Sequence, residues 1–290
     1  MPKKTLYETY TSIRERIALA RRLISFGEIN PALSKLFLEC ATVDDTEVKS
    51  TLESVVRQRL AMQEFETEFK LYSERLVAAG KDPLREDDAY PCLYDRTTET
   101  GYDRHYIYHP AWAARILAQS SPSKHVDISS TLHFCTLISA FIEVDFYDYR
   151  PAPLTLSNLT STAADLTNLP FDTHSIESLS CMHVIEHIGL GRYGDPYDVD
   201  GDKKAASELS RVLAHGGKLL VAFPVGRPRI QFNAHRVYSH EQVLNLFSGL
   251  KLLQHALIPD GDVADGPIEN PSTELIAAQS YGCGCYVFEK

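Results

Sequence analysis

The sequence contains no run of about 20 consecutive apolar residues, the length that a helix needs to cross a bilayer. Its beginning, MPKKTLYETY, also lacks the apolar core of a secretory signal, so we expect a cytoplasmic protein without a membrane span. Hydrophobic residues make up 44% and charged residues 23%, as in globular proteins of one large or two modest domains. This composition excludes collagen-like, disordered and disulfide-scaffold proteins.

The chain also lacks an excess of positive charge. It carries 29 Lys and Arg against 39 Asp and Glu, which gives a formal net charge of -10. Residues 1–80 are balanced, with 12 basic and 12 acidic side chains, so the whole excess of acid lies in residues 81–290. Because a negative field repels phosphate backbones, we expect a small-molecule or saccharide substrate and no nucleic-acid partner.

Cysteine pairs with the spacing of a metal site are absent. None of the six cysteines has a partner across a two-residue gap, which is the spacing typical of zinc knuckles. Cys283 and Cys285 are separated by a single glycine, which is too short for such a knuckle. The pattern favours inert, reduced thiols and no metal site.

The chain divides into three segments. Residues 1–80 form an N-terminal helical segment, with helices expected over 13–24, over 31–37 and from Asp44 or Asp45 to Gly80. The last of these, about 30 residues long, either packs on the next domain or pairs with a second subunit as a homo-oligomer. Residues 81–109 are a connecting segment without a clear period. Residues 110–290 form an α/β domain, in which Pro110 begins the first helix.

Strand and helix patterns alternate from about residue 124 onward. This alternation predicts a doubly wound, mostly parallel, seven-stranded Rossmann-like sheet. The last strand follows a long loop, and we expect it to form an antiparallel edge. The predicted strands cover residues 125–128, 143–149, 161–164, 178–184, 218–224, 251–258 and 284–289, and the helices cover 131–141, 203–213 and 241–247.

Three sequence motifs of the α/β segment resemble those of class I S-adenosylmethionine-dependent methyltransferases. The resemblance extends over residues 105–290. The motifs are Asn168–Asp172 with His183–Ile188, Glu208–Leu213 followed by Gly216–Leu219, and the terminal Tyr286–Glu289 strand. The phrases FNAHRVYSHEQ and EHIGLGRYGDP are similar to an uncharacterised subgroup whose members often accompany surface-polysaccharide genes. The resemblance implies O-methylation of a sugar or other small polar metabolite, with S-adenosylmethionine as cofactor.

The same resemblance implies cofactor-binding positions at the ends of the first four strands. Asp148 matches the acidic residue that binds ribose hydroxyls, and Asp165 and Leu166 match the adenine edge. Asp127 and Ser129 belong to the first strand-to-helix turn, and His183 lies where the fourth predicted strand ends.

The first turn departs from the family, which has three alternating glycines there. Ser129, Thr131 and His133 occupy those positions, and their side chains are expected to crowd the methionine part of the cofactor. Two hypotheses therefore remain open. The protein is either a methyltransferase or a catalytically inactive, methyltransferase-like binding module that assembles through its N-terminal helices.

Candidate catalytic and substrate-binding residues follow the fourth and fifth strands. His187 or His235 is the predicted general base, because the pKa of histidine lies near working pH. For His187, a structural role with the ring bonded to a loop carbonyl fits the sequence at least as well. Loops after strand ends bind substrates in this architecture, and the predicted substrate-binding residues are Asp195, Asn233, Arg236 and Tyr238. The carboxylates of the loop over residues 189–202 are candidate ligands for Mg²⁺ or sugar hydroxyls.

His183 to His187 also spell the inverted zinc-peptidase motif H-x-x-E-H. That motif needs both histidines on one face of a helix, whereas the strand pattern ends near His183. Zinc hydrolysis is therefore a distant third hypothesis.

Overall fold

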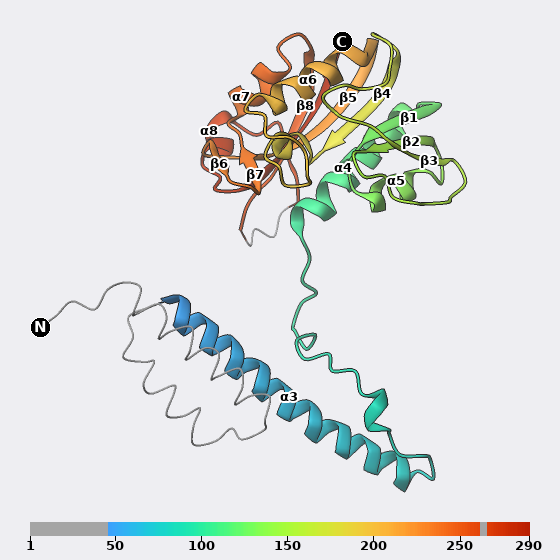
Figure 1. Cartoon of the computed structure of the whole chain (residues 1–290), viewed down its shortest axis with the longest axis vertical. Coiled ribbons are helices and arrows are strands. Elements are labelled where there is room, and N and C mark those ends of the chain that lie inside the picture. Colours follow the sequence, from blue (N-terminus) through green and yellow to red (C-terminus); the bar gives the residue numbers. More distant parts are fainter. Residues whose placement is uncertain (1–45, 262–265) are drawn as a thin grey trace, which may run out of the picture. The chain divides into compact units, whose positions relative to one another are not determined.

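The computed structural model describes residues 46–261 and 266–290 (Figure 1). The chain falls into two compact units, Met1–Thr100 and Gly101–Lys290, which we describe separately. The helices predicted over 13–24 and 31–37, and the helix start at Asp44 or Asp45, lie outside the described residues. Among the helices that are described, none combines the length and the apolar character that a membrane span requires.

The first unit contains one long helix, α3 (Thr46–Ala78), and a short 3-10 turn, η1 (Glu86–Asp88). The segment after η1 returns along α3, where the guanidinium of Arg96 binds the carboxylates of Glu64 and Glu68 at 3.0 and 2.9 Å. All three side chains are exposed, so solvent screens both ion pairs and they contribute little to stability. Pairing of α3 with a second subunit stays a prediction.

The second unit is built on a doubly wound, mostly parallel Rossmann-like sheet, as predicted. Its strand order is β3-β2-β1-β4-β5-β10-β8-β9. The six strands β1 to β5 and β8 share one direction, whereas β10 is antiparallel to both of its neighbours. The strands are β1 (Lys124–Ile128), β2 (Glu143–Asp148), β3 (Leu159–Ala163), β4 (Ile176–Met182), β5 (Leu213–Val225), β8 (Lys251–Ile258), β9 (Ile268–Glu269) and β10 (Gly282–Glu289).

The sheet differs from the prediction at its C-terminal strand. It has eight strands instead of seven, and β10 lies inside the sheet between β5 and β8, while the short β9 forms the antiparallel edge. Every residue from Gly282 to Phe288 is buried. Because both faces of β10 are apolar and its backbone is paired on both sides, an interior position is the stable one.

Helices cover both faces of the sheet. Alternate residues of β5 point to opposite sides: Phe223 belongs to one apolar cluster and Ala222 to the other. The cluster of Ala222 includes α4 (Arg104–Ser120) and α5 (Leu132–Ile138). That of Phe223 includes α6 (Gly201–Val212), α7 (His240–Leu246) and α8 (Thr273–Ala277).

Several element boundaries differ from those expected. Helix α4 begins at Arg104 and not at Pro110, because the side chain of Asp103 accepts a hydrogen bond from the amide of Tyr106 at 3.1 Å and caps the helix. Pro110 therefore lies inside the helix. Some elements are absent from the prediction: β9, α8, the 3-10 turn η2 (Ile185–His187) and the hairpin of β6 (Arg229–Gln231) and β7 (His235–Val237).

A buried polar network links β1 to β4. The ring of His125 lies between the hydroxyls of Ser178 and Ser180, at 2.7 and 2.8 Å. Because Ser180 donates its proton to the carboxylate of Asp127, it accepts a hydrogen bond from Nε2–H of His125. The other nitrogen, Nδ1, accepts from Ser178, so the ring is neutral. Burial lowers the pKa of His125 to about 3.

This network predicts a pH dependence of stability. Unfolding returns the pKa of His125 from about 3 to its ordinary 6.5, so its stabilising contribution is complete above pH 6.5 and is lost as the pH falls toward 3. We expect His125→Gln to reduce the slope of the unfolding free energy against pH by about 1.4 kcal/mol per pH unit, between about pH 4 and pH 6. Urea unfolding across that range measures the slope.

The matched control is His133→Gln, which changes an exposed histidine and should leave the slope unchanged. Burial raises the pKa of Asp127 to about 6. Ionisation of this carboxyl therefore lowers the free energy of unfolding as the pH rises toward 6, which is the opposite of the effect of His125. Asp127 is present in all the proteins compared, so the difference in slope reports on His125. Equal slopes for wild type and His125→Gln would contradict a buried neutral ring.

Candidate functional site

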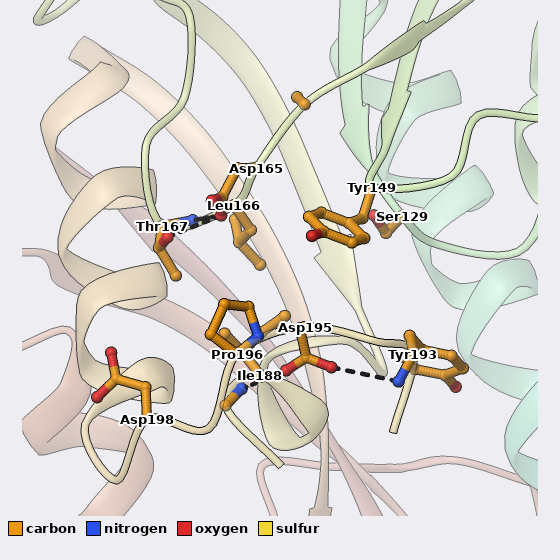
Figure 2. A pocket seen from close by; sticks show the side chains of 12 residues that line it. Ser129, Tyr149, Asp165, Leu166, Thr167, Ile188, Tyr193, Asp195, Pro196 and Asp198 are labelled. Atoms are coloured by element: carbon orange, nitrogen blue, oxygen red, sulfur yellow. Dashed lines mark hydrogen bonds between the residues drawn. The ribbon is translucent and has the colours of Figure 1, made fainter. Parts of the chain in front are cut away.

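A cavity lies at the carboxyl ends of the parallel strands, where open α/β sheets bind their ligands. Its volume is about 140 Å³. Figure 2 shows the lining in three groups: Ser129 with Tyr149, the segment after β3, and the loop after η2. The lining residues are Ser129, Tyr149, Ala164, Asp165, Leu166, Thr167, Ile188, Gly189, Tyr193, Asp195, Pro196 and Asp198.

The turn after β1 forms without its expected glycines. Ser129 takes a φ of +57°, and its amide donates to the carbonyl of Tyr147 at 2.7 Å. This left-handed conformation costs a non-glycine residue about 1–2 kcal/mol. Thr131 caps α5 by accepting from the amide of Phe134, and His133 is exposed. Of the three residues at the glycine positions, only Ser129 lines the cavity.

The segment after β3 presents a carboxylate and an apolar side chain to the cavity. One oxygen of Asp165, Oδ1, accepts from the amide and the hydroxyl of Thr167 at 2.8 and 2.7 Å, which orients the carboxylate. The adjacent Leu166 is buried. Across the cavity, the half-exposed ring of Tyr149 supplies an aromatic surface (Figure 2). This combination suits a flat heteroaromatic ring with an exocyclic amino group.

The loop after η2 is held by its own carboxylates. Asp195 accepts from the amides of Gly189 and Tyr193 at 2.8 and 3.2 Å, and Asp198 binds the ammonium of Lys204 at 2.5 Å. Among the described residues, the carboxylates of this loop do not form a group close enough to share a cation. The loop therefore gives no support to the predicted Mg²⁺ ligands, and Asp195 shapes the cavity wall.

Two predicted cofactor residues lie next to the cavity lining. Asp148, at the end of β2, is half-buried, and its Oδ1 accepts from the amide of Arg150 at 2.7 Å. Asp127 is completely buried, and its carboxylate accepts from the amide of Ser130 at 2.9 Å and from Ser180. Asp127 thus stabilises the turn after β1 from the protein interior, and its carboxylate is not accessible to a ligand.

His187 is the last residue of η2 and lies beside the cavity. Its Nδ1 donates to the carbonyl of Ala234 at 2.6 Å, which makes Nε2 the basic nitrogen. Burial lowers the pKa of His187, so the ring is neutral at neutral pH. The ring packs edge-on against Tyr193, a cavity residue, with a centroid separation of 5.6 Å. The ring of His187 is therefore neutral and contacts a cavity residue, and its role as a general base stays a prediction.

His183 has different surroundings from His187. With a φ of +56°, it directs Nδ1 to Oε1 of Glu186 at 2.8 Å and Nε2 to Sγ of Cys283 at 3.2 Å. Burial raises the pKa of Glu186 to about 7. The 3-10 turn starts only at Ile185, so His183 and His187 do not share a helix, in agreement with setting the zinc-peptidase motif aside.

Of the predicted substrate-binding residues after β5, some are exposed on the hairpin and others are buried. Asn233 is exposed at the tip of the hairpin, and His235 is half-exposed with its ring 6.3 Å from that of His187. Arg236 is buried and donates to the carbonyl of Ile188 at 2.7 Å. Tyr238 is also buried, and its hydroxyl donates to Asp202 at 3.0 Å. Arg236 and Tyr238 therefore hold the loop onto the hairpin.

Two aromatic residues of the cavity, Tyr149 and Tyr193, were not among the predicted site residues. Tyr149 directly follows Asp148, and Tyr193 lies within the predicted glycine-rich loop. The guanidinium of Arg150 lies 4.6 Å from the centre of the Tyr193 ring. The only signal in the sequence was an aromatic residue just after a predicted strand end, which is too common to be informative.

The strand order β3-β2-β1-β4-β5-β10-β8, with β10 antiparallel, is that of the class I S-adenosylmethionine-dependent methyltransferase fold. A family model described as "Caenorhabditis protein of unknown function, DUF268" matches residues 164–257, a range that begins at the cavity and includes η2 and the hairpin. Among curated proteins, none matches the sequence significantly.

Solved structures of similar fold include several methyltransferases. One is the N-methyltransferase NodS from Bradyrhizobium japonicum, at 16% identity over 62% of this chain and 93% of that chain, with a TM-score of 0.42. A TehB-like methyltransferase from Corynebacterium glutamicum has 16% identity; the match covers 78% of this chain and 99% of that chain, with a TM-score of 0.42. A third is the 1,6-didemethyltoxoflavin-N1-methyltransferase of Burkholderia thailandensis, solved with bound S-adenosylhomocysteine. It has 10% identity; the match covers 63% of this chain and 78% of that chain, with a TM-score of 0.44. Since these TM-scores are below 0.5, the fold assignment rests on the strand order.

Proposed function

We propose that the protein is an S-adenosylmethionine-dependent methyltransferase that acts on a hydroxyl of a sugar or similar polar metabolite. The observation that carries this proposal is the cavity at the carboxyl ends of β1 to β4, which combines the Asp165 carboxylate with the Tyr149 ring. The strand order supports it, because this sheet brings those residues together at one edge.

The residues of the cavity fit the adenosine part of such a cofactor. Asp165 would accept from the adenine amino group, and Leu166 and Tyr149 would contact the faces of the ring. Asp148, next to Tyr149, is placed to bind the ribose hydroxyls once its side chain turns outward. The bound cofactor supplies an electrophilic methyl group on a cationic sulfonium, and the net charge of -10 favours a cation.

The acceptor would bind beside Tyr193 and His187. In this position, Nε2 of His187 would accept a hydrogen bond from the acceptor hydroxyl and hold its proton. His235 and Asn233 lie on the adjacent hairpin and are candidates for binding the polar groups of the acceptor. The exposed amide of Asn233 and the half-exposed ring of His235 suit the hydroxyls of a saccharide.

The cofactor site is tested by calorimetry with S-adenosylhomocysteine. We expect the wild-type protein to bind it and Asp165→Asn to bind about 10-fold more weakly, since one charge-assisted hydrogen bond is lost. The matched control is Asp172→Asn, an exposed carboxylate of the same β3–β4 connection that does not line the cavity. Absence of binding to the wild type would favour the alternative of a catalytically inactive module, in which Ser129 blocks the site.

A further inference from the structure

A second group of ligating side chains lies outside the cavity. His105 belongs to α4, His183 follows β4, and Cys283 belongs to β10; one ligand atom of each lies within 4.8 Å of the other two. All three are buried, and Nε2 of His183 is 3.2 Å from Sγ of Cys283. Over residues 46–261 and 266–290, this is the one such group. The five described cysteines are free thiols, and all but Cys92 are buried.

The surroundings of His183 are those of a metal-binding histidine. Its Nδ1 donates to the carboxylate of Glu186 at 2.8 Å, which leaves Nε2 as the lone-pair nitrogen on the side of Cys283. Such a carboxylate–histidine pair fixes the tautomer of a ligand histidine and raises its basicity. The ring of His105 stacks on that of His183, with a centroid separation of 5.2 Å, and Tyr281 stacks on His105 at 5.1 Å.

Unpartnered buried nitrogens lie beside this group. His109, one turn after His105 on α4, is completely buried, and its ring centre is 5.0 Å from that of His183. Neither ring nitrogen of His109 has a hydrogen-bond partner among the described residues, and the same holds for Oε2 of Glu186. Burial of unpaired polar atoms is costly. A water coordinated to a cation in the group would offer two O–H donors, one for Oε2 of Glu186 and one for the basic nitrogen of His109.

We propose that His105, His183 and Cys283 form a zinc-binding site. Two imidazole nitrogens and one thiolate are ligands that zinc prefers. Zn–N and Zn–S bonds of about 2.1 and 2.3 Å set tetrahedral ligands about 3.4–3.7 Å apart. On binding, the 3.2 Å separation of Nε2 of His183 and Sγ of Cys283 would therefore open slightly, whereas the longer separations to His105, which reach at most 4.8 Å, would close. Three protein ligands leave one coordination position for a water or a polar ligand, as in catalytic zinc sites. This site does not depend on the proposed methyl transfer.

The full-length protein, freed of metal by a chelator, tests this site by titration with Zn²⁺ alone. We expect one zinc ion per chain and release of protons on binding, because the Cys283 thiol must ionise to ligate the metal. Titration with Co²⁺ should produce a thiolate-to-metal charge-transfer band in the wild-type protein, a readout that needs no variant. Stoichiometric zinc without that cobalt band would overturn the ligand assignment, and absence of zinc binding would overturn the site.

Variants identify the ligands. Cys283→Ser should lose the cobalt band and weaken zinc binding by more than about 100-fold, since partners that only orient a ligand are worth about 10–100-fold. Glu186→Gln should weaken binding by about 10–100-fold and keep the band. The matched control is Cys181→Ser, a buried cysteine of β4 on the opposite apolar cluster, which should bind zinc as the wild type does. Wild-type affinity in Cys283→Ser would contradict the proposal.

Discussion

Replacing His187 with glutamine is expected to lower the rate of methyl transfer by about 10²–10⁴-fold, the usual contribution of a general base. The glutamine amide can still donate to the carbonyl of Ala234, as Nδ1 of His187 does at 2.6 Å, but it cannot take a proton. Binding of S-adenosylhomocysteine should stay within about twofold of wild type. Initial rates with a saccharide acceptor, combined with calorimetry, separate the two effects.

The pH profile gives an independent check of this role. Because burial lowers the pKa of His187, the wild-type rate should decline only as the pH falls below the ordinary range of histidine. The control is His215→Gln, which changes an exposed histidine near the start of β5, at the end of the strand away from the cavity. A His187→Gln enzyme with the wild-type rate and the wild-type acidic limb would show that His187 has a structural role only.

The substitution Gly226→Ala is expected to lower the free energy of unfolding by about 2–5 kcal/mol. Gly226 follows β5 with a φ of +146°, a conformation that residues with a side chain rarely adopt. A Cβ at this position would lie 2.2 Å from the carbonyl oxygen of Gln279. The amide of Gly226 also donates to the carbonyl of Tyr238 at 2.9 Å, so the backbone cannot move away without losing that bond.

Urea unfolding of both this variant and Gly249→Ala measures the effect. Gly249 has no atom within 4 Å of its added Cβ and is exposed, so its substitution should change the free energy of unfolding by less than about 0.5 kcal/mol. Similar values for the two variants would mean that the contact between Gly226 and Gln279 is not tight in solution.

Much of the α/β fold was predictable from local patterns. The strand Lys251–Ile258 was predicted at its exact bounds, and most other strands to within a few residues, because buried strands are short apolar runs between polar turns. The start of α4 was missed because Pro110 dominates the local pattern, whereas the cap at Asp103 depends on one hydrogen bond. The interior place of β10 was missed because strand order depends on contacts between distant segments.

The candidate site likewise has residues that local patterns indicate and residues whose role depends on contacts between distant segments. The family resemblance pointed to Asp165, Leu166 and Ser129, and all three line the cavity because the carboxyl ends of parallel strands meet at one edge of the sheet. Arg236 could not be distinguished from a substrate-binding cation, because only the folded chain shows that its donors reach a loop carbonyl and Asp202. The absence of paired cysteines argued against a metal site, yet folding brings Cys283 to His183 from 100 residues away.

The sequence by itself determined the alternation of strands and helices, the acidic charge of residues 81–290 and the lack of glycine in the first turn. These properties depend on composition and on neighbours along the chain. Only the tertiary structure decided that Ser129 adopts the left-handed conformation, that the His187 ring is held in its neutral form and that His105, His183 and Cys283 converge. Each of these depends on side chains that are far apart in sequence and meet only when the sheet and its helices pack.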